Sequence, residues 1–272
     1  SLALLGALAC FIHYRLQRDV SVAMIGLALL FIAIVDAFHS LAVMGVVQGR
    51  APKEEFIQFS WAFSRVFNAV ILMLSAVLSL WITRHKVFKS TNAPHSYDLD
   101  FGLKSILVVS MSYFLLCVGL LSLLLNSESL SNTVNPDALI TRPFDVLSLA
   151  LFIFTGSLFW VSHKQKASVL SYALVLSIFP AVLTQFHMAF GSVNAFDNHF
   201  NIAHVLKVVA YGCLLVGILI DLFKVFSNQS ESEPATQPTT TFKNTIENSQ
   251  LLEVGTAKRP IALQLTTAAL VL

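Results

Sequence analysis

Long apolar runs recur along the chain, and they constrain the fold more than any other feature. Each run of about 20 residues, coiled as a helix, matches the roughly 30 Å hydrocarbon core of a bilayer. We expect such helices at 20–47, 57–83, 103–125, 142–162, 168–189 and 201–226. We interpret a shorter apolar run at 2–14 as the last part of a further helix whose start precedes Ser1. The sequence therefore predicts an all-α, polytopic membrane bundle of seven helices.

Composition supports this prediction and excludes other classes of protein. Hydrophobic residues make up 56% of the 272 residues and charged residues 12%, against roughly 45–50% and about 25% in soluble domains. An ordinary soluble globular enzyme is thereby excluded. The net charge of +2 is spread over short connections, so we expect no nucleic-acid partner. The cysteines lie inside apolar runs without a CxxC pattern, and we expect them to pack as small core residues.

The polarity of the chain changes sharply after the last long apolar run. Residues 227–258 are rich in Ser, Thr, Glu and Gln without an apolar period, which is typical of a solvated linker. Residues 259–272 are apolar again, and we interpret them as the truncated start of an eighth helix. We therefore expect a membrane domain at 1–226, a polar cytoplasmic linker at 227–258 and the beginning of another helix at 259–272.

Basic residues are distributed unequally over the two sides of the bundle, and they resist translocation. One side has only Arg50, Lys53 and Arg142. The opposite side has Arg15, Arg18, Arg84, Lys86, Lys89, Lys104, Lys164, Lys166, Lys224, Lys243, Lys258 and Arg259. We expect the richer side to face the cytoplasm of a bacterial inner membrane, with the amino end outside and the linker inside.

Few polar side chains lie at membrane depth, where a charge costs roughly 2.5–3.5 kcal/mol. Residues three or four apart share a helix face, and the polar residues form three such stripes in the outer half of the bundle. The stripes are Asp36 with His39; Trp61 with Arg65 and Asn68; and Asn201 with His204 and Lys207. We expect them to form one polar cluster. In contrast, Asp145, His187 and His13 lie near helix ends, where we expect contact with water or helix capping.

This cluster is compatible with several chemistries. A structural network would only pair Asp36 with Arg65 or Lys207. Asp36, His39 and His204 are also the ligand types of an intramembrane metal-dependent hydrolase, and His39 with His204 could bind haem or a divalent metal. A transporter could use Asp36 as a proton site. Two basic residues against one acid favour a polar or anionic organic ligand or a lipid head group. No nucleophile with a neighbouring base is visible, so we assign no catalytic residue.

Three segments resemble one family of sensors. They are Asp36-Ala-Phe-His39, Trp61-Ala-Phe-Ser-Arg65 and Asn201-Ile-Ala-His204-Val-Leu-Lys207. In this order they resemble motifs of the bacterial membrane-associated sensor domains of the third MASE type, and the resemblance covers nearly all of residues 1–226. It departs from the family pattern near Thr184 and Gln185, where an acidic residue is usual.

The resemblance implies signal input rather than catalysis in this segment. Such seven-helix domains stand at the amino end of histidine kinases and diguanylate cyclases, so it implies a cytoplasmic output domain beyond the linker and a homodimer formed through it. We expect a small molecule, lipid or metal to bind among the stripe residues. In this interpretation His39 and His204 contact the ligand, and the charge pair of Asp36 with Arg65 or Lys207 rearranges.

Overall fold

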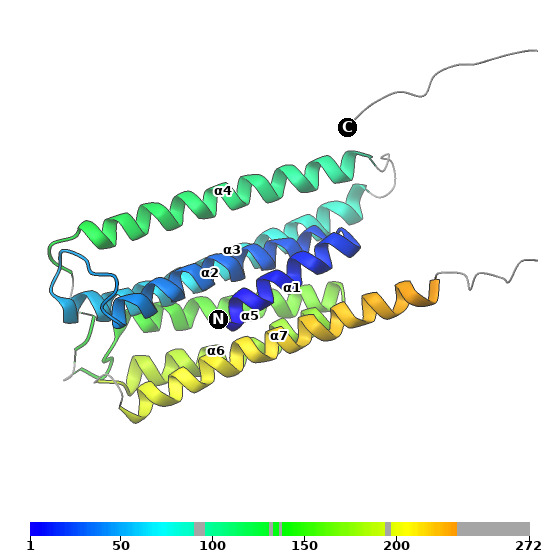
Figure 1. The fold of residues 1–272 in the computed structure, drawn as a ribbon. Helices are drawn as coiled ribbons and strands as arrows, with labels where there is room; N and C mark the ends of the chain where they lie inside the picture. Colours follow the sequence, from blue (N-terminus) through cyan, green and yellow to red (C-terminus); the bar gives the residue numbers. More distant parts are fainter. Residues whose placement is uncertain (90–95, 131–132, 136–137, 194–196, 233–272) are drawn as a thin grey trace, which may run out of the picture. The chain divides into compact units, whose positions relative to one another are not determined.

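The computed structural model describes residues 1–89, 96–130, 133–135, 138–193 and 197–232. The elements in these residues are seven helices, which run side by side along one common direction (Figure 1). They are α1 (Leu2–Gln17), α2 (Val20–Val43), α3 (Lys53–Lys89), α4 (Ser96–Asn126), α5 (Pro143–Gln165), α6 (Val169–Phe190) and α7 (Asn198–Ser232). The all-α prediction is confirmed. The eighth helix expected at 259–272 and the linker beyond residue 232 lie outside the described residues.

Six of these helices, α2 to α7, are long and apolar enough to cross a membrane. The exception is α1, a shorter apolar helix of 16 residues, which spans about 24 Å at roughly 1.5 Å per residue. The chain is thus a multi-pass membrane protein, as the apolar runs predict.

Local sequence signals set several of the helix boundaries. The Asp19 carboxylate accepts a hydrogen bond from the Ser21 backbone N–H and caps the start of α2. Ser168 and Ser171 form a reciprocal capping box at the start of α6, which satisfies two backbone donors that a helix start leaves unpaired. Pro143 occupies the first turn of α5, where its missing N–H costs nothing.

Helix α2 is the centre of the bundle. In its apolar window 78% of the residues are buried, against 11% for α4, which lies at the edge (Figure 1). Helix α2 contacts α1, α3 and α4, and α5 contacts both α3 and α6. Helix α7 packs closely on α6 where Gly217 faces Ala173. A Cβ added at Gly217 would overlap the Cβ of Ala173. Small residues permit this close approach of membrane helices.

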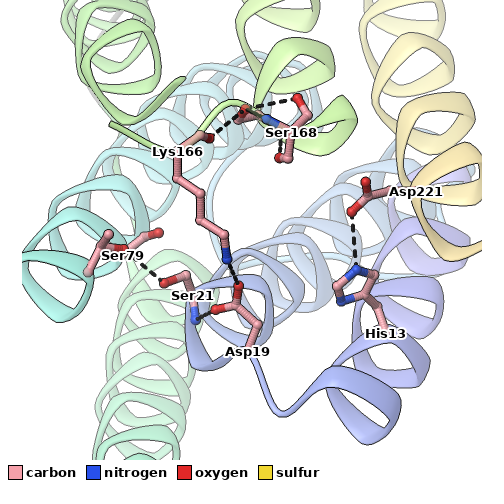
Figure 2. Close-up of polar contacts among 9 residues, drawn as sticks. His13, Asp19, Ser21, Ser79, Lys166, Ser168 and Asp221 are labelled. Atoms are coloured by element: carbon pink, nitrogen blue, oxygen red, sulfur yellow. Dashed lines mark hydrogen bonds and ion pairs between the residues drawn. The ribbon is translucent and has the colours of Figure 1, made fainter. Parts of the chain in front are cut away.

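We call the end at which α2 leads into α3 the α2–α3 end, and the opposite end the α1–α2 end. At the α1–α2 end, Lys166 Nζ lies 2.7 Å from Asp19 Oδ2, which ties the α5–α6 connection to the start of α2 (Figure 2).

A second polar contact at the α1–α2 end involves His13, which corrects a prediction. His13 is buried, and its Nε2 lies 3.1 Å from Asp221 Oδ2 of α7 (Figure 2). The expectation that His13 contacts water is therefore wrong. Its position near the end of α1 suggested solvation, but α7 covers that face of the short helix.

Candidate functional site

The buried carboxylate of Asp36 is the centre of the polar cluster. Oδ1 accepts hydrogen bonds from Arg65 Nη2 and from Asn68 Nδ2, the latter at 3.1 Å. Oδ2 lies 3.0 Å from Lys207 Nζ and accepts a hydrogen bond from the Tyr211 hydroxyl at 3.2 Å. One acid of α2 thus holds two donors from α3 and two from α7. We call Asp36, Arg65, Asn68, Lys207 and Tyr211 the Asp36 cluster.

This cluster lies well inside the bundle. Each depth is counted along the residue's own helix from the terminus at the α2–α3 end, at roughly 1.5 Å per residue. The depth is about 10 Å for Asp36, about 14 Å for Lys207 and about 18 Å for Arg65. Away from water, a charge-assisted hydrogen bond is stronger than a neutral one, and an unpaired charge is costly. The cluster therefore links the packing of three helices to one carboxylate.

An aromatic group lies against the Asp36 cluster. The Trp61 indole stacks on the His204 imidazole, with ring centroids 4.7 Å apart, and meets the edge of His39 at 5.5 Å. Arg65 Cζ and Lys207 Nζ lie 4.9 and 5.6 Å from the Trp61 ring centroid, within the range of cation–π attraction. Trp61 therefore connects the predicted histidines to the predicted cations.

The hydrogen bonds of the two histidines place a proton on Nδ1 of each ring. The Ser60 hydroxyl donates to the Ile57 carbonyl, so at 2.8 Å it accepts from Nδ1–H of His39. His204 Nδ1 likewise donates to the Phe200 carbonyl at 2.9 Å. Each neutral ring then keeps Nε2 as its acceptor nitrogen.

The metal and haem alternatives find no matching geometry. Within the described residues, no three His, Cys, Asp or Glu side chains group so as to hold a metal ion. The proposed ligand Asp36 instead faces two cations, Arg65 and Lys207, which oppose a metal. His39 and His204 both pack against the Trp61 indole, rather than across an open space. The ligand set Asp36, His39 and His204 is therefore not assembled.

Three further residues that the sequence singled out are Asn201, Asp145 and His187. Asn201 is exposed on α7, and its backbone N–H donates to the Asp197 carbonyl. Asp145 is 1% exposed, and the expectation that it contacts water is wrong. The first turn of α5 is covered because Thr141 and Arg142, just before it, hydrogen-bond to the Ala189 carbonyl of α6. His187 is half-buried and lies 3.1 Å from His199, Nδ1 to Nδ1.

Some members of the site were not predicted, although the sequence contains signals for them. Tyr211 follows Lys207 by one helical turn and shares its face, but an apolar neighbourhood made it resemble a packing residue. Ser60 and Ser64 precede Asn68 at intervals of four residues, and both are buried. This periodic small polar stripe was a readable sign that α3 has a polar inner face.

A cavity of about 40 Å³ adjoins the cluster, and Arg65, Asn68, Lys207 and Tyr211 line part of it. Gln185 of α6 also lines it. The fold and this buried site together define a polytopic helical membrane module with a polar site shared among its helices.

The chain belongs to the MASE3 family of membrane-associated sensor domains, whose model matches residues 2–224. The family resemblance predicted from the three motifs is thus confirmed. This family consists of non-catalytic input domains of signalling proteins. No curated protein and no solved structure matches the chain.

Proposed function

We propose that this chain senses a ligand at the Asp36 cluster and relays its binding through α7 to a cytoplasmic output domain, a histidine kinase or a diguanylate cyclase. One observation carries the proposal: Lys207 and Tyr211 of α7 hold the same buried carboxylate as Arg65 and Asn68 of α3. A ligand that takes over one of these donors changes how α7 packs against α2 and α3.

Such a relay needs two packings with different affinity for the ligand. Because Asp36 has several donors, one of them can turn to a ligand while the carboxylate stays paired with the others. The free energies of the two packings can then differ by only a few kcal/mol. The rings of His39 and His204 pack on Trp61, which lies against the Asp36 cluster. We assign both histidines to ligand contact. Helix α7 is the last described helix, so its displacement is carried directly into the residues that follow.

The proposed orientation rests on the distribution of basic residues. The amino end is outside and the chain after α7 is cytoplasmic, so the Asp36 cluster is nearer the outer face of a bacterial inner membrane. In this organisation residues 1–226 form the sensor, 227–258 a linker, and 259–272 the start of a further helix. A homodimer forms through the output domain.

The test is a fusion of the whole chain to a diguanylate cyclase domain, with cyclic dinucleotide measured in cells. Lys207→Met removes a cluster donor from α7 and leaves Asp36 paired with Arg65, so we expect a several-fold change in cyclase output at equal membrane expression. Lys224→Met is the matched control, because Lys224 is exposed on the same helix. Equal output from Lys207→Met, Tyr211→Phe and the parent would overturn the proposal.

A further inference from the structure

The cavity beside the Asp36 cluster has a wall of unusual composition. It lies among five helices, α2, α3, α5, α6 and α7. Its apolar lining includes six large side chains, those of Leu29, Ile32, Leu72, Phe152, Ile178 and Leu214. The polar part of the wall includes Arg65, Asn68, Gln185 and Lys207. A molecule bound here therefore meets a mainly apolar wall to which a few residues with hydrogen-bonding groups also belong.

Two acceptor atoms of this wall lack a hydrogen bond. Asn68 and Gln185 are each 1% exposed, and Asn68 Oδ1 and Gln185 Oε1 have no partner among the described residues. The amide of Asn68 cannot turn over freely, because its Nδ2 donates to Asp36. A buried acceptor without a donor costs about 1–3 kcal/mol. The cavity therefore favours a molecule that brings a hydrogen-bond donor to Asn68.

The charges around the cavity narrow the choice of donor. An ammonium group would be repelled, because Arg65 and Lys207 line the same wall. A carboxylate has no donor for Asn68, and it would compete with Asp36 for cations that are already paired. A neutral hydroxyl donates to an amide oxygen and also accepts from a cation, so it satisfies both kinds of group.

We propose that this cavity binds the hydroxyl end of a small uncharged amphiphile, an alcohol or a phenol dissolved in the bilayer. Its hydroxyl donates to Asn68 and Gln185, and its apolar part lies along the six apolar side chains. This assignment rests on the proposed sensory function and names the class of ligand for the part of that site that the cavity forms, which His39 and His204 do not line.

The size of the cavity suggests how binding becomes a signal. A volume of about 40 Å³ holds a group the size of about three or four water molecules, at roughly 10–15 Å³ each. A hydroxyl with its first carbon atoms fits this volume, whereas a longer apolar part separates the helices that line it. Since α6 and α7 supply Gln185 and Lys207, longer alcohols displace α7 more.

The test is photolabelling of the purified full chain in lipid nanodiscs, read by peptide mass spectrometry. The probe is an octanol that carries a diazirine, and its matched control is the same diazirine alkane without the hydroxyl. We expect saturable labelling of α3, α6 and α7 peptides around the cavity by the alcohol. Loss of one or two hydrogen bonds should weaken the alkane about three- to tenfold. Equal or unsaturable labelling by both probes would overturn the assignment.

Two variants check the role of the amides. Gln185→Leu removes an acceptor without touching Asp36, so we expect the preference for the hydroxyl to fall while the protein stays folded. Asn68→Leu should abolish the preference, provided that circular dichroism shows native helix content. Phe186→Leu is the control on α6, because Phe186 is exposed and does not line the cavity. An unchanged preference in Gln185→Leu and Asn68→Leu would contradict the proposal.

The outcome separates the ligand class from the sensory function, because labelling requires no output domain. If the cavity shows no hydroxyl preference while Lys207→Met still alters cyclase output, only the ligand class is wrong. If labelling behaves as expected while cyclase output ignores every cluster variant, the cavity binds alcohols without sensing them.

Discussion

Helix α7 is held by carboxylate contacts at two levels that differ in kind. In the Asp36 cluster, Lys207 and Tyr211 of α7 share a buried acid with Arg65 and Asn68. At the α1–α2 end, Asp221 of α7 meets a single neighbour from α1, His13, and its side chain is 18% exposed.

The two levels differ in the partners of the carboxylate. Asp36 pairs with an arginine and a lysine, whereas Asp221 meets an imidazole. The first contact also has several donors, and losing one leaves the carboxylate paired. The Asp36 cluster thus holds α7 through more contacts than the His13–Asp221 pair does.

The largest expected effect comes from Asp36→Asn. Removing one partner of a buried ion pair costs about 3–5 kcal/mol, because Arg65 and Lys207 keep their charges without a carboxylate. We expect a large drop in the midpoint of thermal unfolding in detergent and a low yield of folded protein. Asp221→Asn is the matched substitution at the other level and should cost much less. Similar losses from the two variants would remove the distinction between the levels.

A smaller effect is expected for Lys207→Met, which removes the charge of α7 but leaves the pair of Asp36 and Arg65 intact. The lost hydrogen bond to a charged group amounts to about 1.5–3 kcal/mol. The unfolding midpoint should fall between those of Asp36→Asn and the parent. A loss as large as that of Asp36→Asn would mean that Arg65 alone does not neutralise the carboxylate.

The His13–Asp221 pair at the α1–α2 end should contribute still less to the free energy of unfolding. We expect His13→Phe to cost about 0.6 kcal/mol, the average for hydrogen bonds between membrane helices, and no more than their maximum of about 1.7 kcal/mol. In a double-mutant cycle, His13→Phe and Asp221→Asn should be strongly non-additive, whereas Lys207→Met and Asp221→Asn should add. Non-additive effects of Lys207→Met and Asp221→Asn would show that the two levels act as one unit.

The smallest effect is expected for Lys166→Ala, which breaks the contact with Asp19. Lys166 is 66% exposed, and such surface pairs contribute about 0.2–1 kcal/mol. The difference from the parent should disappear in 1 M salt, where the Debye length is about 3 Å. A difference that survives high salt would indicate that this contact is shielded from solvent.

Much of the fold could be predicted, because membrane length and apolar composition leave little choice for a helix. The expected span at 168–189 differs from α6 by one residue at each end. The span expected at 57–83 instead extends to Lys53–Lys89, because charged turns beyond the apolar run remain helical. Hydropathy identifies the apolar part of a helix, but the polar turns on either side of it are decided by capping and packing.

The site was predictable where its members share a helix face. The spacing of Arg65 and Asn68, or of His204 and Lys207, places each pair on one face. The partners Tyr211 and Gln185, and the pairing of His13 with Asp221, depend on how one helix is rotated and staggered against another. Spacing within one helix contains no information about the rotation and stagger between two helices. For the same reason, Asp145 was expected in water.

The pairing of Asp36 with Arg65 has a consequence for how the protein enters the membrane. These two residues belong to α2 and α3, which are consecutive in the chain and in contact. Their charges can therefore neutralise each other within a single helical hairpin during synthesis, before α4 to α7 emerge from the ribosome. Lys207 reaches the bilayer later and finds an acceptor already in place. The order of translation thus builds the binding partner of α7 before α7 itself exists.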